Sequence, residues 1–136
     1  MKVALCHLEL SNGPEQKNIE LLEKAVRIAA EKGANWVITP ETAVQGYYFY
    51  KLEPETKVDK QPSSKLSFLL SLVKDYGLFL FLGCGEYDSE LNYNFNSCIV
   101  FLYFIKNISL SFVSILFCAS LSNKYARLTF NFLFLS

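Results

Sequence analysis

A carboxylate placed directly after an apolar run is the feature of this sequence best suited to chemistry. Residues 36–39 (Trp-Val-Ile-Thr) are apolar or β-branched, as in a buried strand, and Pro40 then removes a backbone donor and ends the strand. Glu41 begins where that strand stops. In open α/β sheets ligands bind at the carboxyl ends of strands, and a carboxylate there can take a proton from a reacting group. Glu41 is therefore a candidate site residue, and a solvated loop glutamate is the alternative on position alone.

The four cysteines could act as nucleophiles or metal ligands by type, but their spacing indicates neither. Cys6, Cys84, Cys98 and Cys118 are far apart, and His7 is the single histidine, so a metal site is not expected. The opening residues contain too short an apolar run for a secretory signal, which predicts reduced thiols in the cytoplasm. Three of the four lie in apolar, strand-like runs, where cysteine behaves as a small hydrophobic residue.

Three elements are expected to place Glu41. Residues 2–8 are rich in Val, Ala and Leu with little polar interruption, and they predict a strand buried on both faces of a sheet. Pro14 opens an amphipathic helix, and Gly33 follows its last turn as a left-handed cap. Together with the strand at residues 36–39, these elements predict a βαβ unit with parallel strands.

The next elements are expected to extend the same sheet. A second helix, capped by Ser63 or the serine after it, has its apolar face on the sheet and ends before Gly77. Residues 78–83 form a continuous apolar run that predicts a buried strand. Residues 92–96 read as a polar turn, and residues 97–102 begin a further strand.

The stretch between Glu41 and the second helix predicts a long surface loop, at residues 42–61. It shows no sustained period and gathers aromatic side chains near its start, at Tyr47, Tyr48 and residues 49–50. Loops this long in compact domains are usually lids, binding loops or disordered segments. The aromatic cluster favours a lid or a binding loop.

The composition changes sharply near residue 100. Basic and acidic residues both total 13, so the overall charge does not indicate a nucleic-acid partner. All the acidic residues, prolines and glycines lie at or before Glu90, and the only charges beyond it are Lys106, Lys124 and Arg127. Residues 101–136 form an apolar tail without a helical or strand period, and this part of the chain is atypical of a globular domain.

A membrane anchor is one interpretation of the tail. Residues 99–120 are long enough for a transmembrane helix, which needs about 20 residues. Lys106 beside Asn107 lies a third of the way in, however, and adds on the order of 2 to 3 kcal/mol against insertion. An α/β protein anchored in a membrane is therefore an alternative and not the favoured interpretation.

The combined motifs resemble the nitrilase, or carbon–nitrogen hydrolase, superfamily. In that family a strand ending in Pro-Glu and followed by Gly-Tyr carries the glutamate of a Glu-Lys-Cys triad, as residues 39–47 do here. The resemblance includes residues 33–38 (Gly-Ala-Asn-Trp-Val-Ile), 83–86 (Gly-Cys-Gly-Glu) and 94–97 (Asn-Phe-Asn-Ser). It covers about residues 1–100, the N-terminal part of such a domain.

The resemblance implies an α/β fold, an αββα sandwich that is usually a homo-oligomer and needs no cofactor. The implied substrate is a small-molecule amide, nitrile or carbamoyl compound. A cysteine thiolate attacks its carbon, a lysine stabilises the developing charge, and a buried carboxylate moves the protons. Glu41 is implied to be that general base. Tyr47 and Tyr48 are implied to line the pocket, with ordinary packing as the alternative.

The chain departs from the family after residue 100. The family's lysine lies in an Arg-Lys-x-His-Leu segment, but Lys106 has no arginine before it and no histidine after it. The family's cysteine precedes an aromatic and an acidic residue, but Cys118 is followed by Ala-Ser. The tail resembles translated non-coding or frame-shifted sequence. We therefore expect a truncated, inactive hydrolase, with a non-catalytic binding or regulatory fragment as the alternative.

Overall fold

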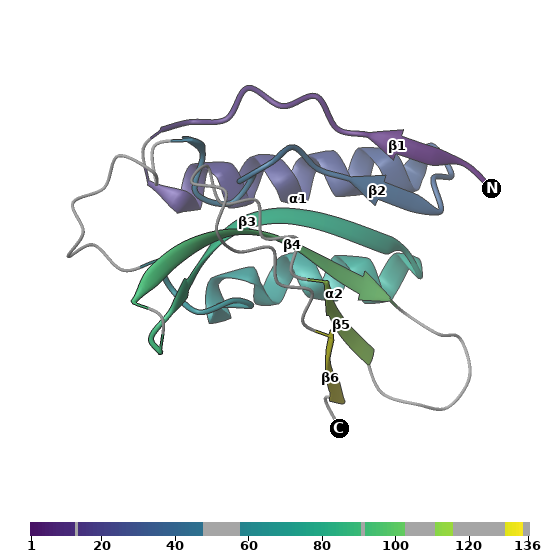
Figure 1. The fold of residues 1–136 in the computed structure, drawn as a ribbon. Helices are drawn as coiled ribbons and strands as arrows, with labels where there is room; N and C mark the ends of the chain where they lie inside the picture. Colours follow the sequence, from purple (N-terminus) through teal and green to yellow (C-terminus); the bar gives the residue numbers. More distant parts are fainter. Residues whose placement is uncertain (13, 48–57, 91, 103–110, 116–129, 135–136) are drawn as a thin grey trace.

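The structure, a computed structural model, describes residues 1–12, 14–47, 58–90, 92–102, 111–115 and 130–134. These residues contain one mixed sheet with the strand order β1-β2-β3-β4-β5-β6 (Figure 1). The strands are β1 (Val3–Leu5), β2 (Trp36–Ile38), β3 (Phe79–Asp88), β4 (Tyr93–Leu102), β5 (Ser111–Ile115) and β6 (Phe130–Phe134). The first three are parallel, which confirms the predicted βαβ start, and each later neighbour is antiparallel.

Two helices connect the parallel strands. They are α1 (Glu15–Glu31), between β1 and β2, and α2 (Ser67–Tyr76), which follows a 3₁₀ turn at Ser64–Leu66 and leads into β3. Gly33 has a φ of +77° and Gly77 a φ of +62°, so the glycine ends predicted for both helices are confirmed. Ser63 lies at the N-cap position of the 3₁₀ turn, but its side chain makes no capping hydrogen bond, and the N-cap residue of α2 itself is Leu66.

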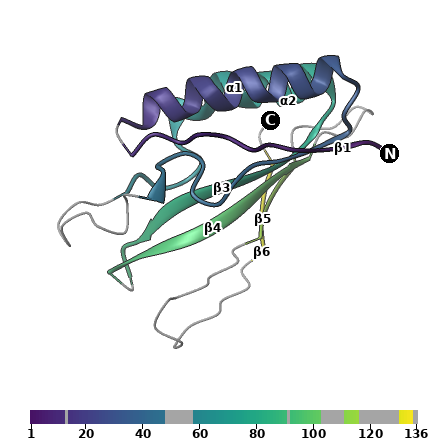
Figure 2. The ribbon, with the colours of Figure 1, turned by 90° about the horizontal axis from the view of Figure 1, so that it is seen from above.

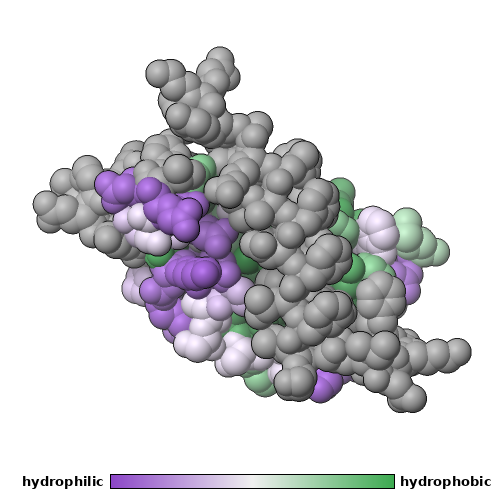
Figure 3. Space-filling model, turned by 60° about the horizontal axis from the view of Figure 1, so that its bottom comes forward, coloured by the Kyte–Doolittle hydropathy of each residue, from purple (hydrophilic) through white to green (hydrophobic). Residues whose placement is uncertain are grey.

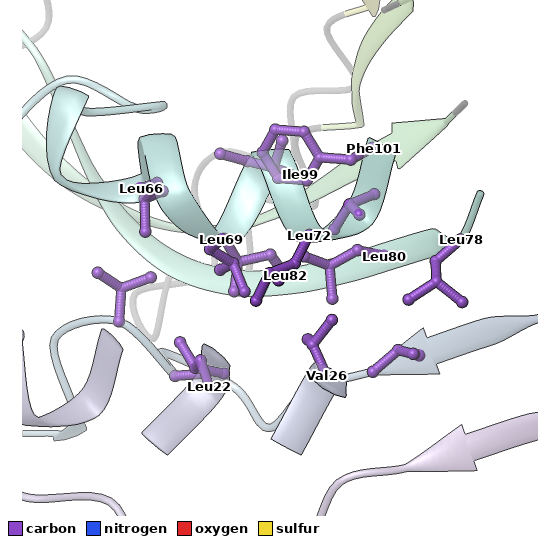
Figure 4. Close-up of a cluster of buried hydrophobic side chains, with 14 of the residues drawn as sticks. Leu22, Val26, Leu66, Leu69, Leu72, Leu78, Leu80, Leu82, Ile99 and Phe101 are labelled. Atoms are coloured by element: carbon purple, nitrogen blue, oxygen red, sulfur yellow. The ribbon is translucent and has the colours of Figure 1, made fainter. Parts of the chain in front are cut away.

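The hydrophobic core lies between the two helices and one face of the sheet. Seen from above, α1 and α2 lie on the same side of the strands (Figure 2). Leu22 and Val26 of α1 gather with Leu69 of α2 and with Leu80 and Phe101 of the sheet, and all five are fully buried (Figure 4). Each such side chain stabilises the fold by about 1.5 to 3 kcal/mol. This packing of helices on a mixed sheet confirms the predicted α/β fold class.

The first strand is shorter and more exposed than predicted. Ala4 packs against the core, but Val3 is 42% exposed and Leu5 76% exposed. Hydrophobic residues also show at the right of Figure 3, the side on which the N-terminus lies in Figure 1. The prediction of burial on both faces is wrong because, among the described residues, helices cover only one face of the sheet and the side chains of Val3 and Leu5 belong to the other face.

The hairpin of β3 and β4 is longer than predicted. The two strands pair along their whole length, from Phe79 opposite Leu102 to Asp88 opposite Tyr93. Of residues 92–96, which were predicted to form a polar turn, residues 93–96 therefore belong to β4. Backbone pairing satisfies the donors and acceptors of a strand whatever the polarity of its side chains, so the ladder runs on past the apolar residues.

The structure contradicts the interpretation of residues 99–120 as a membrane-spanning helix. Residues 99–102 belong to β4, and residues 111–115 form β5. Among the described residues, no helix combines the length and the apolar character needed to cross a membrane. Lys106 and Cys118 lie outside the described residues.

Candidate active site

The backbone before Glu41 is fixed to the neighbouring strand. Thr39 continues the pairing of β2 by donating its N–H to the carbonyl of Phe81, over 3.0 Å. The N–H of Gly83 donates to the hydroxyl of Thr39, also over 3.0 Å, in the place of a backbone acceptor. Pro40 then ends the ladder, as predicted, so Glu41 lies at the carboxyl end of β2.

A glycine on β3 lets the chain around Glu41 lie close to the sheet. A Cβ atom on Gly83 would be 3.0 Å from the Cα of Glu41 and 3.0 Å from the nitrogen of Thr42, and it would overlap the carbonyl oxygen of Pro40. Real Cβ atoms essentially never make a contact as short as the one with the Pro40 oxygen, and the two contacts of 3.0 Å would require the neighbouring backbone to shift. The absence of a side chain at position 83 is therefore a condition for the observed position of Glu41.

The Glu41 carboxylate accepts a hydrogen bond from a strand that is not its neighbour. Nδ2 of Asn96, on β4, donates to Oε1 of Glu41. Asn96 pairs with Gly85 of β3, so its side chain reaches across β3 to the end of β2. Glu41 is exposed in this chain, which contradicts the burial implied for the carboxylate; the described residues place a single sheet here, without a second layer over this face.

The residues directly after Glu41 are buried, so the predicted surface loop is wrong in its first part. Thr42 and Gln45 are 0% and 6% exposed, and the N–H of Gly46 donates to the carbonyl of Thr42 over 2.7 Å. Gln45 accepts the N–H of Gly85 through Oε1 over 2.6 Å, which ties the turn to β3. Thr42 has a φ of +50°, a conformation that costs a β-branched residue on the order of 1 to 3 kcal/mol.

A buried asparagine of α1 holds the same turn from the other side. Asn18 is 1% exposed, and its Nδ2 donates to the carbonyl of Val44 over 3.1 Å and to that of Ser11 over 2.9 Å. The N–H of Ser11 returns a hydrogen bond to Oδ1 over 2.8 Å. Sequence reasoning missed this residue, although its position four residues before Leu22 places it in the apolar stripe of α1.

The structure describes one of the two tyrosines that were predicted to line the substrate pocket. Tyr47 is 53% exposed and lies just after the turn that follows Glu41. Tyr48 and the rest of the aromatic cluster lie outside the described residues. Two buried polar atoms of the turn, Oγ1 of Thr42 and Nε2 of Gln45, have no hydrogen-bond partner.

A second carboxylate lies further along β3. The hydroxyl of Ser97 donates to Oε2 of Glu86 over 3.4 Å, and the residue is half-buried. Burial raises the pKa of Glu86, and the nearby Asp88 raises it further, while the Ser97 hydroxyl and the charge of Lys60 partly offset this. The sequence motif at residues 83–86 contained Glu86, but nothing in the spacing indicated its burial.

The described thiols are not set up as nucleophiles. Burial raises the pKa of Cys6, Cys84 and Cys98, and Glu86 and Cys98 add to the rise for Cys84, which is completely buried. A nucleophilic cysteine needs the opposite shift, since the thiolate is the reactive form. The described residues also contain no group of three His, Cys, Asp or Glu side chains close enough to hold a metal ion.

Comparison with known proteins agrees with this geometry. The sequence profile of the carbon–nitrogen hydrolase family matches residues 2–102. A Pyrococcus abyssi protein described as a nitrilase is 29% identical over 96 residues, which are 69% of this chain and 37% of that protein.

The fold is similar to solved structures of the same superfamily. The Saccharomyces cerevisiae Nit3 structure, described as a member of branch 10 of the nitrilase superfamily, has a TM-score of 0.60 and 25% identity over 83% of this chain and 44% of Nit3. An amidase from Nesterenkonia sp. has a TM-score of 0.52 and 22% identity over 75% of this chain and 37% of the amidase. This chain thus spans less than half the length of these three relatives.

The turn that carries Glu41, the glycine beneath it and the asparagine that reaches it all lie within the matched segment. The predicted resemblance to the N-terminal portion of a nitrilase-like domain is confirmed. The chain belongs to the carbon–nitrogen hydrolase family.

Proposed function

We propose that this chain carries the general-base part of a hydrolase that cleaves non-peptide C–N bonds in small amides, nitriles or carbamoyl compounds. The observation that supports this function is the position of Glu41. Its backbone lies against Gly83 at the carboxyl end of β2, and its carboxylate accepts a hydrogen bond from Asn96. A carboxylate fixed at a strand end is suited to proton transfer with a bound ligand.

In this mechanism Glu41 moves protons for a cysteine and a water molecule. For an amide, the carboxylate takes the thiol proton as sulfur bonds to the substrate carbon, and it returns that proton to the departing amine. It then takes a proton from water as the water oxygen attacks the thioester, and it passes that proton to the departing sulfur, which leaves the acid and the free thiol. A lysine stabilises the negative charge on the substrate oxygen during both steps.

We assign the lysine and cysteine roles to no residue of this chain. The described thiols are held in their protonated form by burial, and Lys106 and Cys118 lack the neighbours found in the family. We therefore propose that this chain is a truncated domain, which does not hydrolyse substrate by itself. The intact domain would be a cytoplasmic homo-oligomer, with Tyr47 and Tyr48 at its substrate pocket and no nucleic acid as a partner.

A chimaera tests the role of Glu41. Residues 2–102 would replace the matched segment of the Pyrococcus abyssi relative, which supplies the rest of the domain, and hydrolysis of small amides and nitriles would be measured. We expect turnover by the chimaera and a loss of about a thousandfold or more in Glu41→Gln, since the amide cannot take a proton. Glu9→Gln, which changes another exposed carboxylate in the same segment, is the matched control.

Two results would oppose the proposal in different ways. A folded chimaera in which Glu41→Gln and Glu9→Gln are equally active would show that Glu41 is not the base. Hydrolysis by the original 136-residue chain, abolished in Glu41→Gln, would keep the base and disprove the truncation.

A further inference from the structure

We propose that Asn96 orients the Glu41 carboxylate, and that Gly83 and Gly85 of β3 leave the space across which the Asn96 side chain reaches it. The inference builds on the proposed function, because orientation matters for catalysis only if Glu41 is the base. The hydrogen bond between the two side chains can be tested by a measurement that does not require catalytic activity.

The strand order makes this contact unusual. Glu41 follows β2 and Asn96 belongs to β4, so β3 lies between them. Direct side-chain pairs in a sheet form between neighbouring strands, about 4.5 to 5.5 Å apart, and a strand two positions away is normally out of reach. An Asn96 side chain that contacts Glu41 has to cross the surface of β3.

The crossing point is a part of β3 that has no side chains on this face, because the side chain of Cys84 belongs to the other face. Side chains alternate along a strand, so Phe81, Gly83 and Gly85 belong to the same face of β3. Gly85 lies opposite Asn96 in the register, and Gly83 lies against the backbone of Glu41. Any larger residue at these two positions would occupy the surface over which the amide extends.

The chemistry of the contact suits a positioning residue. The amide donates to one carboxylate oxygen and is itself uncharged, so it orients the group without placing a net charge beside it. A hydrogen bond to an ionised carboxylate is shorter and stronger than one between neutral groups. A general base must also lie within hydrogen-bond reach of the proton that it takes, and a displacement of 1 Å can cost about a hundredfold in rate.

Nuclear magnetic resonance on the full ¹⁵N-labelled chain tests the contact without any requirement for activity. The side-chain amide signals of Asn96 would be assigned by their loss in Asn96→Leu, a variant of similar volume without a donor. In the original chain we expect one Asn96 amide proton to lie downfield and both signals to move when the pH is lowered until Glu41 is protonated. In Glu41→Gln the movement should disappear and the offset should shrink, because a neutral amide oxygen accepts a weaker hydrogen bond than an ionised carboxylate.

Asn94 supplies the matched control because it lies on the same strand and on the same face, two positions before Asn96. Its amide signals should be the same in the original chain and in Glu41→Gln. Asn96 signals that keep their position and their pH dependence in Glu41→Gln would overturn the proposal. Equal changes at Asn94 and Asn96 would do so as well, since they would report a general rearrangement of β4.

Discussion

Gly83 and Glu41 lie in backbone contact, so that a single added methyl group on Gly83 would stand 3.0 Å from the Cα of Glu41 and overlap the carbonyl of Pro40. The position of the candidate base is thus determined by a residue 42 places later in the sequence, on the neighbouring strand. The same glycine donates its N–H to the hydroxyl of Thr39. The position of Glu41 therefore depends on β2, which it follows, and on β3, which contributes Gly83.

The first prediction concerns this contact. Gly83→Ala should lower the free energy of unfolding by about 1 to 3 kcal/mol, because the methyl group meets rigid backbone rather than the end of a flexible side chain. Urea unfolding of the full chain, followed by circular dichroism, measures the change. An unaltered midpoint would show that the turn at Glu41 can withdraw from β3 without cost.

The second prediction concerns Asn96 in the active chimaera. Asn96→Leu should lower kcat by about a hundredfold and leave KM nearly unchanged, since the side chain orients the base and is not expected to bind the substrate. Asn94→Leu is the control at a neighbouring position of β4 and should keep kcat. If Asn96→Leu raises KM and leaves kcat intact, Asn96 is a substrate contact instead.

Local patterns in the sequence predicted the elements that place Glu41. The apolar period gave α1, the glycines gave the ends of both helices, and the run before Pro40 gave β2. These features depend on residues within a few positions of one another. Because Pro40 directly follows the apolar run, the end of β2 could be predicted from the sequence alone.

What the sequence did not predict depends on contacts between distant residues. Asn96 is 55 residues from Glu41, and its reach depends on the register of β3 against β4. The exposure of Leu5 depends on which face the helices cover, and the burial of Thr42 depends on close packing against Gly83. The number of apolar residues in a strand indicates neither its partner nor its register.

The third prediction concerns the buried thiol Cys84. Its raised pKa means that the folded state keeps the proton where the unfolded state loses it, near pH 8.5. The unfolded state then binds fewer protons, so the free energy of unfolding should fall as the pH rises above about 8.5. Denaturation between pH 7 and pH 10 measures this slope, and Cys84→Ala should reduce it to the part that Cys6 and Cys98, whose pKa values burial also raises, still contribute.

Alkylation gives an independent measure of the same thiol. Iodoacetamide at pH 8 should modify Cys84 at least about a hundredfold more slowly in the folded chain than in urea, because only the exposed thiolate reacts. Mass spectrometry of the peptides identifies the site. Rapid modification in the folded chain would contradict both the burial and the raised pKa.

The fourth prediction concerns the half-buried carboxylate of Glu86. Burial is the main cause of its raised pKa, so its contribution to stability is present below the unfolded pKa of about 4.3 and is lost as the pH rises through the folded pKa. Glu86→Gln removes this loss and should raise the melting temperature more at pH 7 than at pH 4. Glu90→Gln is an exposed control on the same hairpin. Equal gains for Glu86→Gln at both pH values would contradict the assignment.

The fifth prediction follows from the exposed edge strand. Leu5 is 76% exposed on β1, which is an edge strand of the sheet formed by the described residues, and an edge strand with exposed apolar side chains favours pairing with other chains. Leu5→Lys should increase the fraction of soluble protein after expression and reduce self-association on a sizing column. The charge faces water and removes little packing, so the melting temperature should change by no more than a few degrees.

Ala4→Lys is the opposite control: Ala4 packs against the core, and a lysine there should destabilise the fold. If Leu5→Lys instead lowers stability as much as Ala4→Lys, the outer face of β1 is covered in solution and the prediction is wrong.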